Sequence, residues 1–416
     1  MARQMKDSGI EWIGQIPEEW KLSKIGAIYE ERNEKVSDTD FQPLSVTKQG
    51  VIPQLESAAK SNDSDNRKLI RKNDFVINSR SDRRGSCGIS EYDGSCSLIN
   101  TVLKPRRNMC NAYYGFVFRS ECFADEFYRW GNGIVDDLWS TKWSNMKRIY
   151  IPAPPLKEQE KIASYLDRKC AEIDAIIAKQ QQIIEKLKEY KLSVITEAVT
   201  KGLDPNVPMK DSGVEWIGMV PEEWRISRIK YICEFNPGTK KANHDVVSYA
   251  PMECVKDGYL IKKEIRHDGI STGLTSFEEG DIIMAKVTPC FENGNIAIAK
   301  DLVNKFGVGS SELFVFRAKK VNTQWLFYFL RNSIFKKLAE ATMTGTGGLK
   351  RVSPSFIRDF SLALPPEKEQ RRIIEYLDKK CMEIDRVIKY KQSAVEKLGQ
   401  YKKSLIYEVV TGKMEV

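Results

Sequence analysis

Arginine, lysine and short hydrogen-bonding side chains are concentrated between residues 67 and 84, where seven cations face only two aspartates. The last part of this stretch, N-S-R-S-D-R-R, combines the side chains that can contact a DNA duplex. Arginine can pair with guanine through two hydrogen bonds, asparagine can do so with adenine, and serine can bind a phosphate. We therefore predict that Asn78, Arg80, Arg83 and Arg84 bind DNA. The alternative interpretation is a solvated loop of a basic protein.

A glycine-rich stretch, T-G-T-G-G-L-K-R at Thr344–Arg351, is a second candidate. Its glycines would let backbone N–H groups approach a phosphate, and its last two residues add positive charge. A flexible loop without a ligand is the alternative. Both the stretch at 67–84 and the glycine-rich stretch have an equivalent segment in the other half of the chain, and both equivalent segments contain lysine. The predicted DNA contacts outside residues 67–84 are Lys142, Lys147, Lys286, Thr346, Gly347, Lys350 and Arg351.

The residue patterns of known catalytic sites are not present in the sequence. It contains no G-x-x-x-x-G-K-[ST], H-E-x-x-H or G-x-S-x-G motif. The chain has two histidines, and its nine cysteines form no C-x-x-C pair, which suits reduced thiols in a cytosolic protein. We therefore predict no catalytic residue, no bound metal and no cofactor.

Composition narrows the class of protein. A hydrophobic content of 41% and a charged content of 30% suit a soluble globular protein with much helical surface. No apolar run is long enough to span a membrane, and the first residues lack the layout of a signal peptide. The formal net charge of +9 favours a polyanionic partner. We expect a cytoplasmic protein without membrane contact.

The elements that must position these candidates occur twice. The motif M-K-D-S-G-[IV]-E-W-I-G begins at Met5 and again at Met209, and P-E-E-W follows it both times. P-P-x-K-E-Q begins at Pro154 and again at Pro365, after a shift of 211 residues. A repeat of this length with two copies predicts two pseudo-equivalent halves rather than a solenoid.

Each half contains a mixed segment and a long charged helix. The mixed segments contain short strand-like runs, at Asp74–Ile77 and Asp281–Met284, between polar turns. The tryptophans of the repeated motifs are expected to pack in the cores. We predict an α+β protein made of two globular mixed α/β domains and two long antiparallel coiled-coil helices, with pseudo-two-fold symmetry. The predicted parts are domain 1 at 1–153, a spacer helix at 154–203, a linker and domain 2 at 204–364, and a second spacer helix at 365–416.

Two helices are predicted, from about Leu156 to Val199 and from about Glu367 to Val410. Pro-Pro precedes each and glycine follows each, as is typical of helix starts and C-termini. Apolar residues recur at steps of three, four and seven, which predicts a heptad seam. Polar residues interrupt both seams at matching places, Gln180 and Lys391, then Lys191 and Lys402. The seam residues predicted to join the helices are Leu166, Ile173, Ile177, Ile184, Leu187, Val194, Leu377, Ile384, Ile388, Val395, Leu398 and Leu405.

Matching seams should bury each other most simply in an antiparallel pair. The mixed domains would then lie at opposite ends of a helix pair about 66 Å long. The alternative is that each helix folds back on its own domain. A two-fold relation would also bring the C-terminal residues close to the first repeated motif.

The chain resembles the specificity subunit of type I restriction-modification enzymes. The resemblance covers the whole length and rests on the two K-D-S-G-[IV]-E-W-I-G motifs with P-E-E-W, the two P-P-x-K-E-Q helix starts, the Y-L-D strings at Tyr165 and Tyr376, and the V-T-K-G-L-D-P-N-V-P-M-K-D-S-G junction. It implies two target-recognition domains, each of which reads one half of a split DNA sequence, with the helices as a spacer. It also implies a complex with two methyltransferase subunits and with restriction-translocase subunits. S-adenosylmethionine, ATP and Mg²⁺ would belong to those partners, and the family has no shared motif for base-reading residues.

Three other functions remain open at this stage. A stand-alone sequence-specific DNA-binding regulator would bind its site without a methyltransferase. A nuclease of unknown type would cleave DNA in the presence of magnesium. A purely structural coiled-coil scaffold would leave the two divergent mixed segments without a role.

Overall fold

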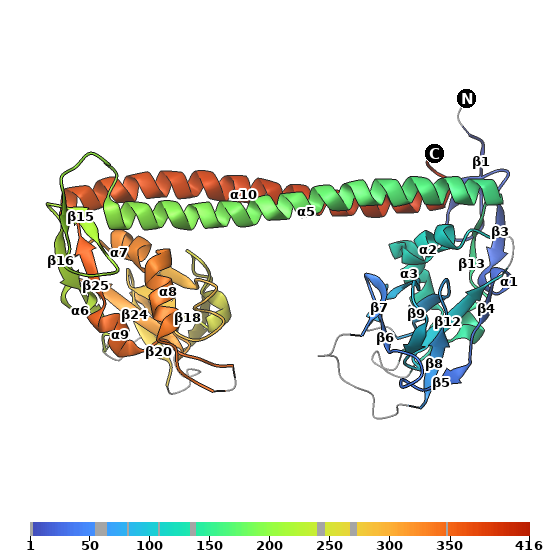
Figure 1. Ribbon diagram of the computed structural model, residues 1–416, viewed down its shortest axis with the longest axis horizontal. Coiled ribbons are helices and arrows are strands. Elements are labelled where there is room, and N and C mark those ends of the chain that lie inside the picture. The colour runs from blue at the N-terminus through green and yellow to red at the C-terminus, as the bar shows by residue number, and fades with distance from the viewer. Residues whose placement is uncertain are drawn as a thin grey trace. The chain divides into compact units, whose positions relative to one another are not determined.

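The chain forms two compact units in a computed structural model. Unit 1 comprises Met1–Gln181 with Gln392–Val416, and unit 2 comprises Gln182–Lys391. The structure describes residues 3–54, 65–80, 83–106, 109–133, 139–238, 246–266, 273–346 and 348–416. Both units contain a mixed α/β segment and part of each long helix (Figure 1).

Both units are built around an antiparallel four-stranded sheet with the same strand order. In unit 1 the order is β10-β9-β12-β4 and in unit 2 it is β22-β21-β24-β17. The strand-like runs predicted from sequence lie in the equivalent strands β9 and β21, which confirms them to within one residue. The bounds are Tyr29–Glu31 (β4), Phe75–Asn78 (β9), Cys87–Ile89 (β10), Asn100–Pro105 (β12), Cys233–Phe235 (β17), Ile282–Ala285 (β21), Ile296–Ile298 (β22) and Leu313–Ala318 (β24).

Two helices follow the longest strand of each sheet, and their side chains pack into the core of the unit. In unit 1 they are α2 (Asn111–Arg119) and α3 (Glu121–Arg129), and in unit 2 they are α7 (Thr323–Leu330) and α8 (Ser333–Ala341). The second helix of each pair starts with a side-chain cap. Ser120 Oγ accepts the N–H of Phe123 at 3.3 Å, and Asn332 Oδ1 accepts the N–H of Phe335 at 2.8 Å. Aromatic side chains from these helices fill both cores, Phe118 and Phe123 in unit 1 and Trp325, Phe329 and Phe335 in unit 2.

The remaining elements differ more between the units. Unit 1 adds a three-stranded sheet, β11-β8-β5, and the hairpin β6-β7, whereas unit 2 adds the four-stranded sheet β19-β18-β23-β20. In unit 1 their bounds are Ile25–Ile28 (α1), Lys35–Val36 (β5), Leu44–Thr47 (β6), Gly50–Pro53 (β7), Arg67–Ile70 (β8), Gly94–Cys96 (β11) and Trp143–Met146 (α4). In unit 2 they are Ile229–Ile232 (α6), Val246–Ala250 (β18), Met252–Cys254 (η3), Lys263–Arg266 (β19), Thr275–Glu278 (β20), Val303–Lys305 (η5), Phe306–Gly309 (β23) and Pro354–Asp359 (α9).

The repeated motif at the start of each half folds into the same small hairpin. These hairpins are β1-β2 (Met5–Asp7 and Gln15–Pro17) in unit 1 and β14-β15 (Met209–Asp211 and Met219–Pro221) in unit 2. In both motifs the aspartate accepts the N–H of the glycine two residues later, at 3.0 Å for Asp7 and 2.9 Å for Asp211. Those glycines, Gly9 and Gly213, have φ near +70°, a conformation that favours glycine. The repeated motif therefore forms the same turn in both units.

Tryptophans of these motifs lie in the cores, as the sequence predicts. Trp12, Trp20 and Trp224 are buried, and Trp216 is half-buried against the core of unit 2. A two-stranded ladder follows each motif and connects it to the start of the long helix. The paired strands are β3 (Lys21–Lys24) with β13 (Tyr150–Ala153), and β16 (Arg225–Arg228) with β25 (Ser361–Leu364).

The long helices are α5 (Leu156–Lys201) and α10 (Glu367–Val410). Their predicted starts are confirmed, and α5 extends two residues beyond its predicted end. Gly202 and Gly412 follow the helices with φ of +82° and +73°, as expected of glycines just past a helix C-terminus. Within the part of the chain that the structure describes, no helix is long and apolar enough to cross a membrane.

The predicted seam packs between the two helices in both units. In unit 1, Leu166, Ile173 and Leu405 belong to one core cluster, with Ile177 and Leu398 packed against it. In unit 2, Val194 and Leu377 share a cluster, and Ile184, Ile384 and Ile388 form another, with Leu187 at its margin. Val395 is half-buried. Early residues of α5 therefore meet late residues of α10, and the reverse, which is an antiparallel pairing.

Two of the polar residues that interrupt the seam form equivalent ion pairs across it. Lys402 Nζ lies 2.6 Å from Asp174 in unit 1, and Lys191 Nζ lies 2.8 Å from Asp385 in unit 2. After the 211-residue shift, Asp174 corresponds to Asp385 and Lys191 corresponds to Lys402. Each ion pair therefore has its counterpart in the other unit, with the roles of α5 and α10 exchanged.

The C-terminal residues lie against the first repeated motif, as expected. Tyr407 Oη donates to the backbone oxygens of Trp12 and Ile13, at 3.3 and 3.2 Å. A Cβ on Gly412 would lie 2.4 Å from Pro17 Cδ, so this position has no room for a side chain. In unit 2, Gly202 occupies the same kind of place beside Trp224 and Pro221.

Candidate nucleic-acid interface

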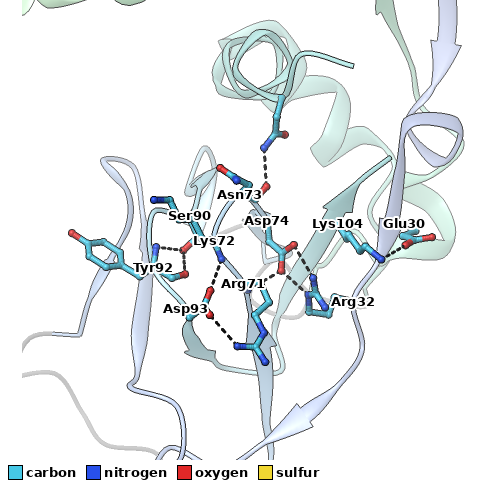
Figure 2. Close-up of polar contacts among 11 residues, drawn as sticks. Glu30, Arg32, Arg71, Lys72, Asn73, Asp74, Ser90, Tyr92, Asp93 and Lys104 are labelled. Atoms are coloured by element: carbon cyan, nitrogen blue, oxygen red, sulfur yellow. Dashed lines mark hydrogen bonds and ion pairs between the residues drawn. The ribbon is translucent and has the colours of Figure 1, made fainter. Parts of the chain in front are cut away.

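Strand β9 of unit 1 is fixed at its start by a buried aspartate (Figure 2). The side chain of Asp74 is 2% exposed and accepts Arg32 Nε at 2.6 Å and Arg32 Nη2 at 3.2 Å. Asp74 also accepts the N–H of Arg71 at 2.9 Å, which closes the turn before the strand. The hydrogen bonds that Arg32 donates to Asp74 raise the pKa of Arg32.

A wider polar network holds the turns around this aspartate. Figure 2 shows the Arg71 side chain and the Lys72 backbone N–H directed toward Asp93, which accepts them at 2.9 Å and 2.7 Å. Lys104 pairs with Glu30 at 3.1 Å on the neighbouring strands. With its start held in this way, β9 presents the predicted DNA-binding loop at its other end.

A groove of about 620 Å³ lies at that end of the sheet. One wall comes from the loop after β9 and another from residues 140–147, and a backbone bridge between Arg80 and Ser140 joins them. The predicted residues Arg80, Lys142 and Lys147 are exposed and line this groove together. Arg80 and Lys142 are far apart in the sequence, which did not indicate that they would line one groove. The groove is lined by Glu31, Asn33, Lys68, Ser79, Arg80, Leu98, Ile99, Thr101, Ser140, Lys142, Trp143, Ser144 and Lys147.

The other predicted residues of unit 1 have different surroundings. Asn78 is buried, and its Oδ1 accepts the N–H of Arg80 at 3.0 Å, so its side chain shapes the turn. Arg83 is exposed, with its backbone in the same turn. Arg84 forms an ion pair with Asp125 of α3, and its guanidinium lies 5.2 Å from the ring centre of Tyr128. Arg84 is therefore held against its own domain, while Arg80 faces the groove.

The equivalent place in unit 2 brings together most of its predicted residues. A backbone bridge joins Val287, just after β21, to Arg351, as Arg80 and Ser140 are joined in unit 1. Lys286 Nζ donates to the backbone oxygen of Ser311 at 2.7 Å and lies 3.9 Å from Glu312. Arg351 is bound by the same glutamate through two contacts of 2.9 Å. Hydrogen bonding from Arg351 lowers the pKa of Glu312.

Backbone contacts fix the glycine-rich loop against the strand. Thr288 N donates to the backbone oxygen of Lys350 at 2.9 Å, and Lys350 N donates to Thr288 Oγ1 at 3.0 Å. The side chains of Lys350 and Thr346 are exposed. Gly347 lies outside the described residues, as do His244 and His267. None of these placements tests DNA contact, so the predicted residues of both units stay predictions.

Some residues of this region escaped the sequence analysis. Asn33, Leu98, Trp143 and Ser144 line the groove of unit 1, but they come from separate short segments without a common motif. Glu312 binds Arg351, lies 3.9 Å from Lys286, and stands 39 residues before Arg351 in the sequence. Only the three-dimensional structure could identify these residues.

The repeated P-P-x-K-E-Q motif has a clear structural role. Gln159 Nε2 donates to the backbone oxygen of Pro154 at 2.8 Å, while its Oε1 accepts the N–H of Cys110, the N-cap of α2, at 2.9 Å. Gln370 makes the same contacts with Pro365 and with Asn322, the N-cap of α7, both at 2.9 Å. The glutamine thus attaches each long helix to its own mixed segment.

The described residues contain no group of three or more His, Cys, Asp or Glu side chains that could hold a metal ion. The described residues instead form two equivalent loop regions, each with a backbone bridge after the central strand and each with its own charge arrangement. Together with the two long helices, they define a class of tandem-repeat proteins with two mixed α/β segments.

The family is shown by sequence comparison. The sequence model of the type I restriction modification DNA specificity domain matches residues 17–189 and 221–395, more than half of the chain. The chain therefore belongs to the family of type I restriction-modification DNA specificity proteins. Each match covers one mixed segment and part of the long helix that follows it.

Curated relatives support the same family. The specificity subunit of the type I restriction enzyme EcoEI of Escherichia coli is 31% identical over 199 residues, which cover 46% of this chain and 33% of that protein. The EcoKI specificity subunit of Escherichia coli K12 is 20% identical over 431 residues, 96% of this chain and 90% of that protein. The chain thus spans about a third of the EcoEI subunit and nearly all of the EcoKI subunit.

Solved structures show the same fold. A chain from a study of complex assembly and conformational transition of the type I R-M system aligns with a TM-score of 0.71 at 14% identity, covering 96% of this chain and 99% of that chain. The HsdS subunit from Thermoanaerobacter tengcongensis aligns with a TM-score of 0.51 at 15% identity, covering 96% of this chain and 98% of that chain. The predicted fold class is thereby confirmed.

Proposed function

We propose that this chain is the DNA specificity subunit of a type I restriction-modification complex. Each mixed segment reads one half of a bipartite, asymmetric DNA target, and the paired helices set the distance between the half-sites. Family membership supports this function, and so does the duplicated scaffold with its two unlike loop regions. Like scaffolds with unlike contact residues are what two different half-sites require.

The observation that carries the proposal is the groove of unit 1. Three exposed cations, Arg80, Lys142 and Lys147, converge on it from two chain segments. Lysine and arginine in such a groove attract the phosphate backbone, and Arg80 is held by its backbone beside the polar side chains of Ser79 and Ser140. Phosphate contacts place the protein on the duplex, and the neighbouring polar groups then meet base edges.

Partners follow from this function. We propose that two methyltransferase subunits bind this chain and that restriction-translocase subunits join through the complex. S-adenosylmethionine, ATP and Mg²⁺ belong to those partners, and this chain performs no catalysis. The complex works on DNA in the cytoplasm.

A segment exchange tests the proposed reading of half-sites. Residues 18–153 are replaced by the same region of a relative, and the full chain is expressed with its methyltransferase subunit. Because each segment reads its own half-site, one half of the methylated sequence should change completely while the other half stays the same. Long-read sequencing of methylated genomic DNA measures both halves. An unchanged pattern, or a change in both halves, would contradict the proposal.

A helix insertion tests the proposed spacer. One heptad that continues the seam is inserted after Gln181 in α5 and after Lys391 in α10, at the boundary between the units. Seven residues add about 10.5 Å of helix, so the gap between half-sites should grow by about three base pairs. The control inserts the heptad into α5 alone, which breaks the seam pairing and should abolish methylation. A methylated site with an unchanged gap in the double insertion would rule out the spacer role.

A further inference from the structure

An ion pair at the surface of unit 2 holds an arginine in a geometry that suits contact with a DNA base. Arg351 Nε lies 2.9 Å from one carboxylate oxygen of Glu312, and Arg351 Nη2 lies 2.9 Å from the other. The side chain of Arg351 is 47% exposed and that of Glu312 is 27% exposed. An ion pair with so exposed an arginine adds little to stability, so stability alone is a weak reason for its geometry.

The two contacts leave one edge of the guanidinium available. A guanidinium is planar and carries five N–H groups in a fixed fork. Glu312 occupies the edge made by Nε and Nη2, so the edge made by Nη1 and Nη2 is turned away from the carboxylate. That edge has the two parallel donors that pair with O6 and N7 of guanine in the major groove.

Backbone contacts hold both members of the pair in place. The backbone of Arg351 exchanges two hydrogen bonds with Thr344, of 2.8 and 3.1 Å, and is bridged to Val287 after β21. Glu312 N donates to Ser310 Oγ at 3.1 Å, immediately before β24 begins. The arginine is therefore ordered before it meets DNA, which reduces the entropy that binding would cost.

The charge of the pair also favours base contact over phosphate contact. Glu312 balances the charge of Arg351 and lies 3.9 Å from Lys286, so the attraction of this place for phosphate is weakened. In unit 1, Arg80 lines a groove with Lys142 and Lys147, where a carboxylate does not bind it in this way within the described residues.

We propose that Arg351, fixed by Glu312, is a specificity-determining residue that reads the guanine of one G·C pair in the half-site of unit 2. This inference rests on the proposed function, because it names the base pair that the second mixed segment recognises. Glu312 acts as a positioning residue, since it orients the guanidinium without contacting the base.

The test uses the full chain with its methyltransferase subunit and records the methylated sequence genome-wide. Arg351→Ala should relax one guanine position of one half-site, with discrimination there falling by about 10- to 100-fold. Arg351→Lys keeps the charge but loses the fork, so it should relax the same position with smaller loss of affinity. Arg351→Gln should shift preference at that position from guanine toward adenine, because glutamine pairs with adenine through two hydrogen bonds.

Two further variants separate the roles of the pair from the general effect of charge. Glu312→Gln keeps the shape of the side chain and removes its charge, so discrimination at the same guanine should fall by about 3- to 10-fold. Arg358→Ala removes an exposed arginine from α9 of the same unit and should leave the methylated sequence unchanged. Thermal melting of each purified variant checks that the fold is kept.

The outcomes distinguish this inference from the function on which it rests. If the unaltered chain directs methylation to a bipartite site and Arg351→Ala and Arg351→Lys keep every position of that site, the inference is wrong and the proposed function stands. If the unaltered chain directs methylation to no bipartite site, both are wrong. Relaxation of a guanine position in Arg351→Ala but not in Glu312→Gln would overturn the positioning role of Glu312.

Discussion

Units 1 and 2 each have a loop region after the equivalent strand of their own four-stranded sheet, but the cations of the two loop regions have different partners. In unit 1, Arg80, Lys142 and Lys147 are exposed around a groove, whereas in unit 2 Glu312 binds Arg351 and lies near Lys286. Under the proposed function, the scaffold would fix where DNA contacts are made, and the local charge pairing would fix what kind of contact each unit makes.

A second difference concerns the buried aspartate that fixes the central strand. Asp74 and Asp281 occupy equivalent positions, and each is 2% exposed and bound by an arginine through two contacts. Unit 1 supplies this arginine from Arg32 beside β4, whereas unit 2 supplies Arg317 from β24. The aspartate is thus constant in the scaffold, while the cation has moved to a neighbouring strand.

Removal of the shared aspartate should have the largest effect on stability. Asp74→Ala leaves the partly buried Arg32 without its buried carboxylate, and Asp281→Ala leaves Arg317 with the more exposed Glu278 only. Each variant should lower the free energy of unfolding of its own unit, by up to about 3–5 kcal/mol for Asp74→Ala and by less for Asp281→Ala. Hydrogen exchange under increasing denaturant measures each unit separately. Glu30→Ala removes the exposed carboxylate that pairs with Lys104 and Arg106 and serves as the control, with an expected loss much smaller than that of Asp74→Ala. Losses below about 1 kcal/mol for both aspartates would show that the two units do not depend on this contact.

The difference in charge pairing should appear in the salt dependence of DNA binding. Replacement of Arg80, Lys142 and Lys147 by alanine removes up to three phosphate contacts, so the slope of log K against log salt should become shallower by up to about 2.7. Lys286→Ala removes a cation already bound within unit 2, and its slope should change by well under about 0.9. Fluorescence anisotropy with the full complex, between about 50 and 200 mM salt, measures both slopes. Equal changes in the two variants would abolish the distinction between the units.

The glutamine contacts should behave alike in both units. Gln159→Ala and Gln370→Ala each leave a backbone N–H and a backbone oxygen without a side-chain partner, which should cost about 1–3 kcal/mol in the respective unit. Gln181→Ala, an exposed position of α5, should cost less than about 0.5 kcal/mol and is the matched control. Chemical denaturation followed by hydrogen exchange gives the three values. A large loss in one unit with none in the other would mean that the repeated motif has different roles in the two halves.

Much of the scaffold could be predicted from sequence because its signals are local and repeated. Proline pairs, a heptad of apolar residues and a following glycine defined the long helices to within two residues. The strands after Asp74 and Asp281 were recognisable from short buried apolar runs. The sequence also placed Lys286 in the loop equivalent to that of Arg80, and Lys142 in the counterpart of the glycine-rich loop, since the repeat aligns the two halves.

The candidate site could be predicted only as a set of residue types. Arg84 and Arg80 are similar in sequence context, yet Arg84 binds Asp125, 41 residues away, while Arg80 lines the groove. Asn78 was a candidate for adenine recognition, and in the structure its side chain closes a turn. A polar residue in a loop has many potential partners, and pattern alone does not choose among them.

The sequence by itself determined a duplicated chain, two long helices with matching seams and two mixed segments, because periodicity and turn residues act over a few neighbours. Tertiary structure decided which cations remain open to a partner and which are neutralised within the fold. That choice depends on contacts such as those of Arg351 with Glu312 and Arg84 with Asp125, which join residues about 40 positions apart. Electrostatic pairing depends on distance in space, and only the folded chain sets that distance.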